Sequence, residues 1–112
     1  MNKRLFVDSN IFIESLKNIP NNRAVELIQL IFSDSENVFF FLESNKEILP
    51  IARNFIKKNK LKPNDSLILA SAIHYKLNGI ITLDSDFIEV AKEENIKVIN
   101  TPDELKSLTR GS

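Results

Sequence analysis

The sequence contains no cysteine, no tryptophan, one histidine and two glycines among its 112 residues. Without cysteine, the chain forms neither a disulfide framework nor a thiolate metal site. The single histidine, His74, excludes a zinc site built from several imidazoles. The 15 basic residues are balanced by 15 acidic residues, so the strong positive charge of many nucleic-acid-binding proteins is missing.

Long hydrophobic runs are also missing. No apolar segment reaches the length that crosses a bilayer, and the N-terminus lacks the pattern of a signal peptide. We therefore expect a cytoplasmic protein with no membrane segment. A composition of 43% hydrophobic and 27% charged residues is typical of globular proteins. The length fits one domain, which we assign to residues 1–109, and we interpret residues 110–112 (Arg-Gly-Ser) as a tail left by a cloning vector.

Short apolar segments alternate with segments that have helical spacing. The apolar segments predict four strands, at residues 4–7, 38–42, 80–83 and 97–99. The other segments predict helices at residues 9–17, 22–32, 65–77 and 85–94, and two more that begin near residues 46 and 101. Wholly apolar strands separated by helices indicate an α/β fold: a small parallel sheet of about four strands, covered on both faces in three α/β/α layers.

Capping patterns support several predicted helix starts. Residues 44–47 (SNKE) and 101–104 (TPDE) match the capping box, and Ser85 is a suitable N-cap for the helix that follows it. The helix at residues 65–77 is apolar almost all round, so we expect it to lie sandwiched between other elements. We expect Gly79 to end this helix.

Carboxylates gather where the predicted strands end. Asp8 follows the first strand, Asp84 and Asp86 follow the third, and Asp65 begins the apolar helix. Parallel strands bring such residues to one edge of the sheet, where α/β proteins bind ligands. Several carboxylates in a partly desolvated site repel one another, and a hard cation such as Mg²⁺ or Mn²⁺ relieves that repulsion. Asp65, Asp84 and Asp86 also lie near predicted helix starts, where aspartate is a good N-cap, so the residues alone support a metal site and helix capping equally.

Three segments resemble the motif blocks of PIN-domain proteins and occur in the same order. They are VDSNIFIESL at residues 7–16, LKPNDSLILASAIHY at 61–75 and ITLDSDF at 81–87. The resemblance implies a parallel-sheet α/β/α fold and a metal-dependent ribonuclease that acts on RNA. Many PIN proteins are VapC-type toxins that a cognate antitoxin holds inactive, so the resemblance also implies an antitoxin partner.

The resemblance assigns a role to each polar position of the motifs. The positions that match catalytic acids are Asp8, Asp65, Asp84 and Asp86. The first three match metal ligands, and the fourth matches an additional acid that acts through a second metal or a water. Asn10 and Thr82 match supporting polar positions that orient the ligands.

The chain departs from the family upstream of residue 22. Typical members carry a further helix–strand–helix segment there, with a glutamate that supplies a fourth acid, whereas this chain runs from SLKNIP directly to NNRAVELIQLIF. We therefore interpret it as a shortened member. Glu43 is the preferred replacement for the missing acid, if the second strand pairs with the first. Glu14 is the other candidate, and the third alternative is that no residue replaces it.

Two hypotheses of function follow from this comparison. The first is a metal-dependent endoribonuclease of the PIN type, acting as the toxin of a toxin–antitoxin pair. The alternative is a catalytically impaired PIN-like module that acts by binding protein or RNA, because the glutamate-bearing helix is missing. A receiver-like or nucleotide-binding domain is a weaker third reading, since the chain has no glycine-rich phosphate loop.

The missing segment would also leave apolar surface uncovered. The helix at 65–77 and the phenylalanines at 39–41 are candidates for that surface, so we expect a homodimer or a larger homo-oligomer. His74 lies about half a turn round the helix from Asp65 and is expected to point away from the acids. The basic run at residues 57–62 fits contacts with RNA phosphates, or the favourable placement of cations at a helix C-terminus.

Overall fold

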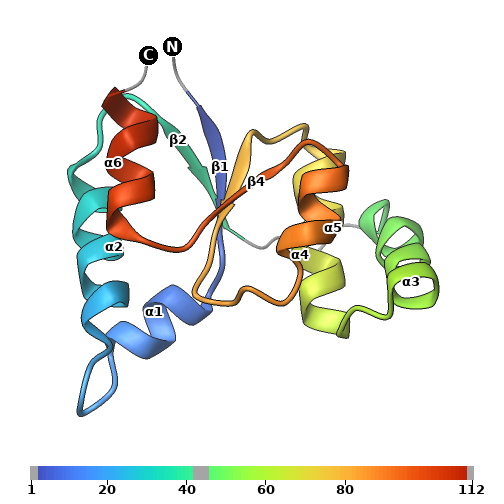
Figure 1. Ribbon diagram of the computed structural model, residues 1–112, viewed down its shortest axis with the longest axis horizontal. Helices are drawn as coiled ribbons and strands as arrows, with labels where there is room; N and C mark the ends of the chain where they lie inside the picture. The colour runs from blue at the N-terminus through green and yellow to red at the C-terminus, as the bar shows by residue number, and fades with distance from the viewer. Residues whose placement is uncertain (1–2, 42–45, 111–112) are drawn as a thin grey trace.

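A computed structural model of the protein describes residues 3–41 and 46–110 (Figure 1). Within these residues, strands and helices follow one another in the order that the sequence predicts. The strands are β1 (Arg4–Val7), β2 (Val38–Phe40), β3 (Gly79–Ile81) and β4 (Lys97–Ile99). The helices are α1 (Asn10–Ser15), α2 (Asn22–Ser33), α3 (Ile48–Asn59), α4 (Pro63–His74), α5 (Ile88–Glu93) and α6 (Pro102–Arg110). None of the described helices is both long enough and apolar enough to span a membrane.

The four strands form one parallel sheet in the order β2-β1-β3-β4. The central strand β1 pairs with β2 through Leu5 and Phe39, and with β3 through Phe6 and Ile80. The residues of β1 and β3 are almost all buried, as expected for a parallel sheet that is covered on both faces. The predicted α/β fold with a small four-stranded parallel sheet is therefore confirmed.

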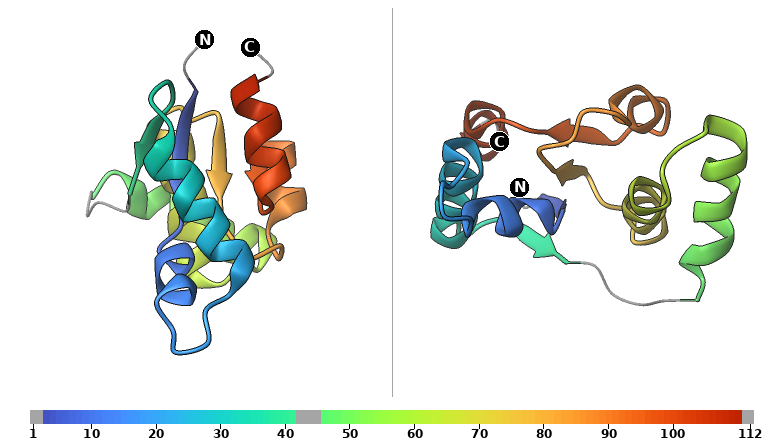
Figure 2. Two further views of the ribbon diagram at one scale, coloured as in Figure 1. Left: turned by 90° about the vertical axis from the view of Figure 1, so that its left-hand side faces the viewer. Right: turned by 90° about the horizontal axis from the view of Figure 1, so that it is seen from below.

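Helices cover both faces of this sheet (Figures 1 and 2). Alternate residues of β1 serve the two sides, because successive side chains of a strand point in opposite directions. Leu5 and Val7 pack in a cluster with residues of α1, α2 and α6, whereas Phe6 packs in a cluster with residues of α3, α4 and α5. The molecule thus has the predicted α/β/α layers, with one apolar core on each side of the sheet.

The apolar helix α4 is sandwiched, as the sequence predicts. It contacts β1 and β3 on one side and packs against α3 on the other, where Ile48, Ala52 and Ala70 form a small cluster of their own. α3 therefore lies outside α4, as the right-hand view of Figure 2 shows. Because the chain itself buries α4, this helix does not supply the exposed apolar surface that we expected for an oligomer.

α3 and α4 begin at other residues than the sequence predicts. α4 begins at Pro63 rather than at Asp65, because proline is favoured at the first helical position, where no backbone donor is lost. Its N-cap is Lys62, and Asp65 lies in the first turn. α3 begins at Ile48, slightly later than expected, and the predicted cap at Ser44 lies outside the described residues.

Two further predictions near β3 are corrected by the structure. α5 begins at Ile88 with Phe87 at its N-cap, so Ser85 is not the N-cap. Gly79 begins β3 and does not end the preceding helix. A Cβ atom at Gly79 would lie 2.8 Å from the carbonyl oxygen of Lys97, so the close approach of β4 explains why a glycine stands there.

The start of α6 agrees with the predicted capping box. Oγ1 of Thr101 accepts a hydrogen bond from the backbone N–H of Glu104 at 3.2 Å. The carboxylate of Glu104 reaches back and accepts from the hydroxyl of Thr101 at 3.1 Å and from the backbone N–H of Asn100 at 3.3 Å. Pro102 occupies the first helical position, as expected.

Candidate metal centre at the carboxyl edge of the sheet

The strands β1 and β3 place two polar residues side by side where they end. Val7 pairs with Ile81, and the backbone N–H of Asp8 donates to the carbonyl oxygen of Ile81 at 2.9 Å. On the other side of β3, the N–H of Thr82 donates to the carbonyl oxygen of Ile99 at 3.0 Å. Backbone pairing therefore fixes Asp8 and Thr82, which are only 2% and 0% exposed.

The hydroxyl of Thr82 joins the polar side chains of this edge. It donates a hydrogen bond to Oδ2 of Asp8 at 2.7 Å. It also accepts two hydrogen bonds, from the backbone N–H of Asp84 at 3.1 Å and from Nδ2 of Asn10 at 3.3 Å. The backbone N–H of Asn10 donates to Oδ1 of Asp8 at 3.3 Å. Four residues that the sequence singles out thus belong to one hydrogen-bonded network.

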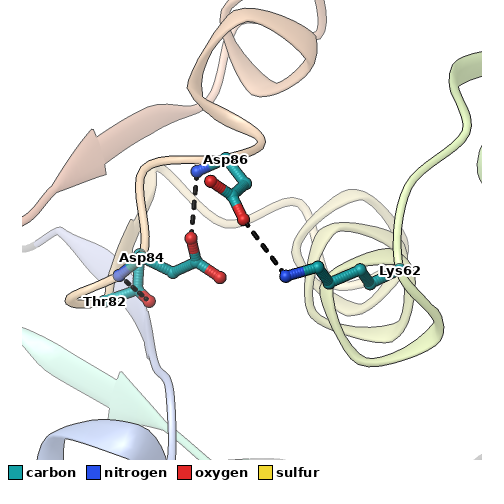
Figure 3. A network of polar contacts seen from close by, with 4 residues as sticks. All are labelled: Lys62, Thr82, Asp84 and Asp86. Carbon is teal, nitrogen blue, oxygen red and sulfur yellow. Dashed lines mark hydrogen bonds and ion pairs between the residues drawn. The ribbon is translucent and has the colours of Figure 1, made fainter.

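Asp84 and Asp86 lie in the turn that follows β3 (Figure 3). Oδ1 of Asp84 accepts a hydrogen bond from the backbone N–H of Asp86 at 3.0 Å, the local contact by which aspartate stabilises a turn. Figure 3 shows both carboxylates directed to the side from which Lys62 approaches. The turn therefore presents two neighbouring carboxylates beside the first turn of α4.

The first turn of α4 supplies a third carboxylate, that of Asp65. This residue is only 4% exposed, and its Oδ2 has no hydrogen-bond partner among the described residues. Burial and the charge of Asp84 raise the pKa of Asp65 to about 6. Lys62 acts in the opposite direction, and Asp8 and Asp86 add to the increase. Most buried acceptors in proteins have a partner, so an unpartnered oxygen here requires an explanation.

The three carboxylates have a spacing that fits a metal ion. Oxygens of Asp65, Asp84 and Asp86 all lie within 4.8 Å of one another. A donor set made only of carboxylate oxygens suits hard cations. Acidic groups often gather on a surface without an ion, but a cation also accounts for the unpartnered oxygen of Asp65. Helix capping does not, because the N-caps of α4 and α5 are Lys62 and Phe87.

Asp8 is not a member of this group of three carboxylates but lies beside it. Both of its oxygens already accept hydrogen bonds, from Thr82 and from Asn10. Its negative charge nevertheless acts on Asp65, whose pKa it raises. Of the residues that the sequence proposes as metal ligands, the structure therefore groups Asp65 and Asp84 closely. It links Asp8 to Asp84 through two hydrogen bonds of the Thr82 hydroxyl.

The candidates for a fourth acid fare differently. Glu43 lies outside the described residues, although β2 does pair with β1, as the proposed role of Glu43 requires. Glu14 forms an ion pair with Lys17 on α1 at 2.5 Å, and it is not part of the close group of acids among the described residues.

Lys62 is a residue whose place in the site the sequence did not reveal. We interpreted it only as part of a basic run, whereas its Nζ lies 3.4 Å from Oδ2 of Asp86 (Figure 3). The one signal in the sequence is its position three residues before Asp65.

His74 lies at the opposite end of α4. Its Nε2 is 3.2 Å from Oε2 of Glu47, in keeping with the expectation that His74 points away from the acids.

The raised pKa of Asp65 predicts a pH dependence of stability in the metal-free protein. The protonated carboxyl group is favoured in the folded state, so its contribution is complete below the ordinary pKa of 3.8 and is lost as the pH rises through about 6. We expect Asp65→Asn to stabilise the protein relative to wild type by about 2 kcal/mol more at pH 7.5 than at pH 4.5. Urea unfolding in EDTA measures this difference, and an equal effect at both pH values would contradict the prediction.

The Thr82 hydroxyl predicts a second effect on stability. Thr82→Val keeps the shape of the side chain but leaves Oδ2 of Asp8 and the N–H of Asp84 without this partner. We expect a loss of about 2–3 kcal/mol in the free energy of unfolding. Thr82→Ser retains the hydroxyl and should cost about 1 kcal/mol for the lost methyl group. Chemical denaturation of both variants tests this order, and a serine variant as unstable as the valine variant would exclude the hydroxyl as the cause.

Comparison with known proteins identifies the family. The model of the PIN domain family matches residues 28–93, which is more than half of the chain. The matched segment contains Asp65, Asp84 and Asp86, whereas Asp8 precedes it.

The chain is also similar to two curated proteins of Methanocaldococcus jannaschii. It is 42% identical to Ribonuclease VapC2 over 62 residues and 39% identical to Ribonuclease VapC6 over 61 residues. These segments cover 55% and 54% of this chain but only 42% and 40% of the two relatives. The matched part therefore spans less than half of the length of either curated relative.

A solved structure shares the fold. The crystal structure of FitAcB from Neisseria gonorrhoeae aligns with a TM-score of 0.51 at 18% sequence identity, and the alignment covers 88% of this chain and 97% of that chain. At this identity the likeness concerns the fold alone. Because the family model covers more than half of its length and includes three clustered acids, the chain belongs to the PIN domain family.

Proposed function

We propose that this protein is a metal-dependent endoribonuclease of the PIN type. The observation that carries the proposal is the carboxylate of Asp65, which is buried and lies in a close group with Asp84 and Asp86. Its Oδ2 has no hydrogen-bond partner in the part of the chain that the structure describes. A fold has little reason to bury an acceptor in this state unless a ligand completes it. The two similar proteins of Methanocaldococcus jannaschii are named ribonucleases, and this supports the choice of RNA as substrate.

The acids would hold Mg²⁺ or Mn²⁺, the cations that oxygen-only ligands favour. A divalent cation supplies positive charge next to the scissile phosphate and activates water for its attack. We propose Asp8, Asp65 and Asp84 as its ligands, with Asp86 as the additional acid of the group. Asp84 and Asp86 are held in place by the turn that they form, and Asp65 by the first turn of α4.

Asn10 and Thr82 are the proposed positioning residues. The hydroxyl of Thr82 orients Asp8 and holds the backbone of Asp84, while Nδ2 of Asn10 donates to that hydroxyl. Oδ1 of Asn10 is buried and finds no hydrogen-bond partner within residues 3–41 and 46–110, so it adds a second unpaired acceptor next to the acids. Both residues thus act through the carboxylates rather than on the phosphate itself.

We further propose that the protein is the toxin of a toxin–antitoxin pair, works in the cytoplasm and binds an antitoxin. The names of its two VapC relatives support this role. None of the described helices is long and apolar enough to cross a membrane.

Cleavage of RNA in the presence of Mn²⁺ or Mg²⁺ tests the proposed activity. We expect wild type to cleave single-stranded or structured RNA, and Asp84→Asn to lose at least about 100-fold in rate because the cation loses a charged ligand. Glu36→Gln is a matched control, since it removes one exposed negative charge near the start of β2, at the opposite edge of the sheet. Its rate should equal that of wild type, and EDTA should abolish cleavage in both.

Two other outcomes would argue against the enzyme. Equal cleavage by wild type and Asp84→Asn would indicate a contaminating nuclease. A wild-type protein that does not cleave RNA, although Mn²⁺ raises its melting temperature, would favour the catalytically impaired binding module.

The proposed homo-oligomer finds support on α1 and α2 rather than on α4. Phe12 contacts Phe32 and Phe41, with ring centroids 6.4 Å and 5.5 Å apart, and Phe32 is 72% exposed. Leu16 of the loop after α1 is 82% exposed as well. Apolar side chains that are exposed to this extent are candidates for an interface.

Sedimentation measurements test this oligomer. We expect wild type to sediment with at least twice the chain mass of 12.8 kDa. Phe32→Ser should shift the protein towards the monomer, whereas Ile56→Ser, at a 37% exposed position of α3, should not. A wild-type monomer at micromolar concentration would refute the proposal.

A further inference from the structure

Lys62 occupies a position that combines a fixed backbone with an exposed charge. Its carbonyl oxygen accepts hydrogen bonds from the backbone N–H and from the hydroxyl of Ser66, both at 2.9 Å. The residue is thereby held as the N-cap of α4, three positions before Asp65. Its side chain, in contrast, is 73% exposed and ends 3.4 Å from Oδ2 of Asp86.

The ion pair between Lys62 and Asp86 does little to stabilise the fold. The partner carboxylate is itself 59% exposed, and ion pairs in contact with solvent contribute little because water and salt screen them. The placement of the lysine therefore needs another explanation. Of the three described ion pairs, this is the one that reaches the close group of acids.

Charge balance gives that explanation. The group contains three carboxylates, and the unpartnered oxygen of Asp65 indicates that a cation completes it. A divalent cation and the ammonium group of Lys62 have the same sign of charge, so they compete for Asp86. A backbone phosphate of RNA resolves this competition because it offers anionic oxygens to both. Lysine suits this task, since its flexible stem can move a compact positive charge from one anion to another.

We propose that Lys62 is a substrate-positioning residue, whose ammonium group contacts the RNA backbone phosphate that lies over Asp65, Asp84 and Asp86. The inference rests on the proposed ribonuclease function and adds a residue to it. The contact helps the site to bind RNA, and the ion pair with Asp86 holds the ammonium group close to the place where the phosphate enters.

Three variants at matched positions test this role. Lys62→Met removes the charge and keeps the stem, and Lys62→Arg keeps the charge. Lys97→Met removes an exposed charge at the first residue of β4. The strands are parallel, so this residue lies at the edge of the sheet opposite the acids. For each variant, KM and kcat are measured for cleavage of single-stranded RNA in Mn²⁺ at several salt concentrations, and calorimetry measures the affinity for Mn²⁺ alone.

We expect Lys62→Met to raise KM roughly tenfold, in line with the loss of one charged contact to phosphate. The slope of log KM against log salt should fall by about 0.7, the value for one phosphate contact on a single strand. Its affinity for Mn²⁺ should rise by roughly threefold, since a competing positive charge is gone. Lys62→Arg should restore most of the affinity for RNA, and Lys97→Met should match wild type in all three measurements.

Lys62→Met is expected to weaken the binding of RNA and to strengthen the binding of Mn²⁺. These opposite changes distinguish a positioning role of Lys62 from general damage to the site. If Lys62→Met weakens the binding of both RNA and Mn²⁺, the lysine has only a structural role and the proposal is overturned. A Lys62→Met variant with unchanged KM and unchanged salt slope overturns the proposed role of Lys62 as well. In that case, cleavage of RNA by wild type still supports the proposed ribonuclease function. If wild type does not cleave RNA at all, the proposed function fails, and the salt slope of RNA binding then decides the role of Lys62 separately.

Discussion

The hydroxyl of Thr82 donates to Asp8 and accepts from the backbone of Asp84, and the arrangement of the acids depends on this group. It can act in this way because β1 and β3 are paired in a register that ends with Val7 opposite Ile81. Each strand then delivers its next residue to the same buried point. A shift of one residue in that register would turn the side chains of β1 to the wrong faces and separate the hydroxyl from the carboxylate.

The same edge of the sheet contains a conflict between stability and chemistry. The fold buries Asp65 against two other carboxylates, and the described residues provide no hydrogen-bond donor for one of its oxygens. In a purely structural setting such an arrangement is unfavourable, since both desolvation and repulsion act against the charged form. The surrounding apolar clusters on the two faces of the sheet supply the stability that makes it tolerable. Local conflicts of this kind are concentrated at functional sites.

The sequence predicts most of the fold because the relevant signals are local. The apolar runs at 4–7 and 97–99 coincide with β1 and β4, and the capping box at Thr101 marks the start of α6. The start of α4 was missed because Asp65 resembles an N-cap, whereas Pro63 fixes the first helical position. The place of Gly79 was missed because its reason, the carbonyl group of Lys97, comes from another strand.

The sequence likewise predicts one part of the candidate site and not the other. Ligand sites of parallel sheets lie beyond the carboxyl ends of the strands, so the sequence predicts a group of carboxylates there. Asp65, Asp84 and Asp86 form that group. The hydrogen bond by which Thr82 holds Asp8 joins residues 74 positions apart, so no local pattern in the sequence predicts it. The contact between Lys62 and Asp86 joins residues 24 positions apart, so the pattern of charges in the sequence does not distinguish this lysine from its neighbours.

α3 lies outside α4 and supports the helix that carries Asp65. α3 packs mainly on α4, and only residues 60–62 connect the two helices. The first turn of α4, which carries Asp65, follows this short connection directly. The backbone that carries Asp65 therefore depends on the packing of α3 against α4 as well as on the contacts of α4 with the sheet.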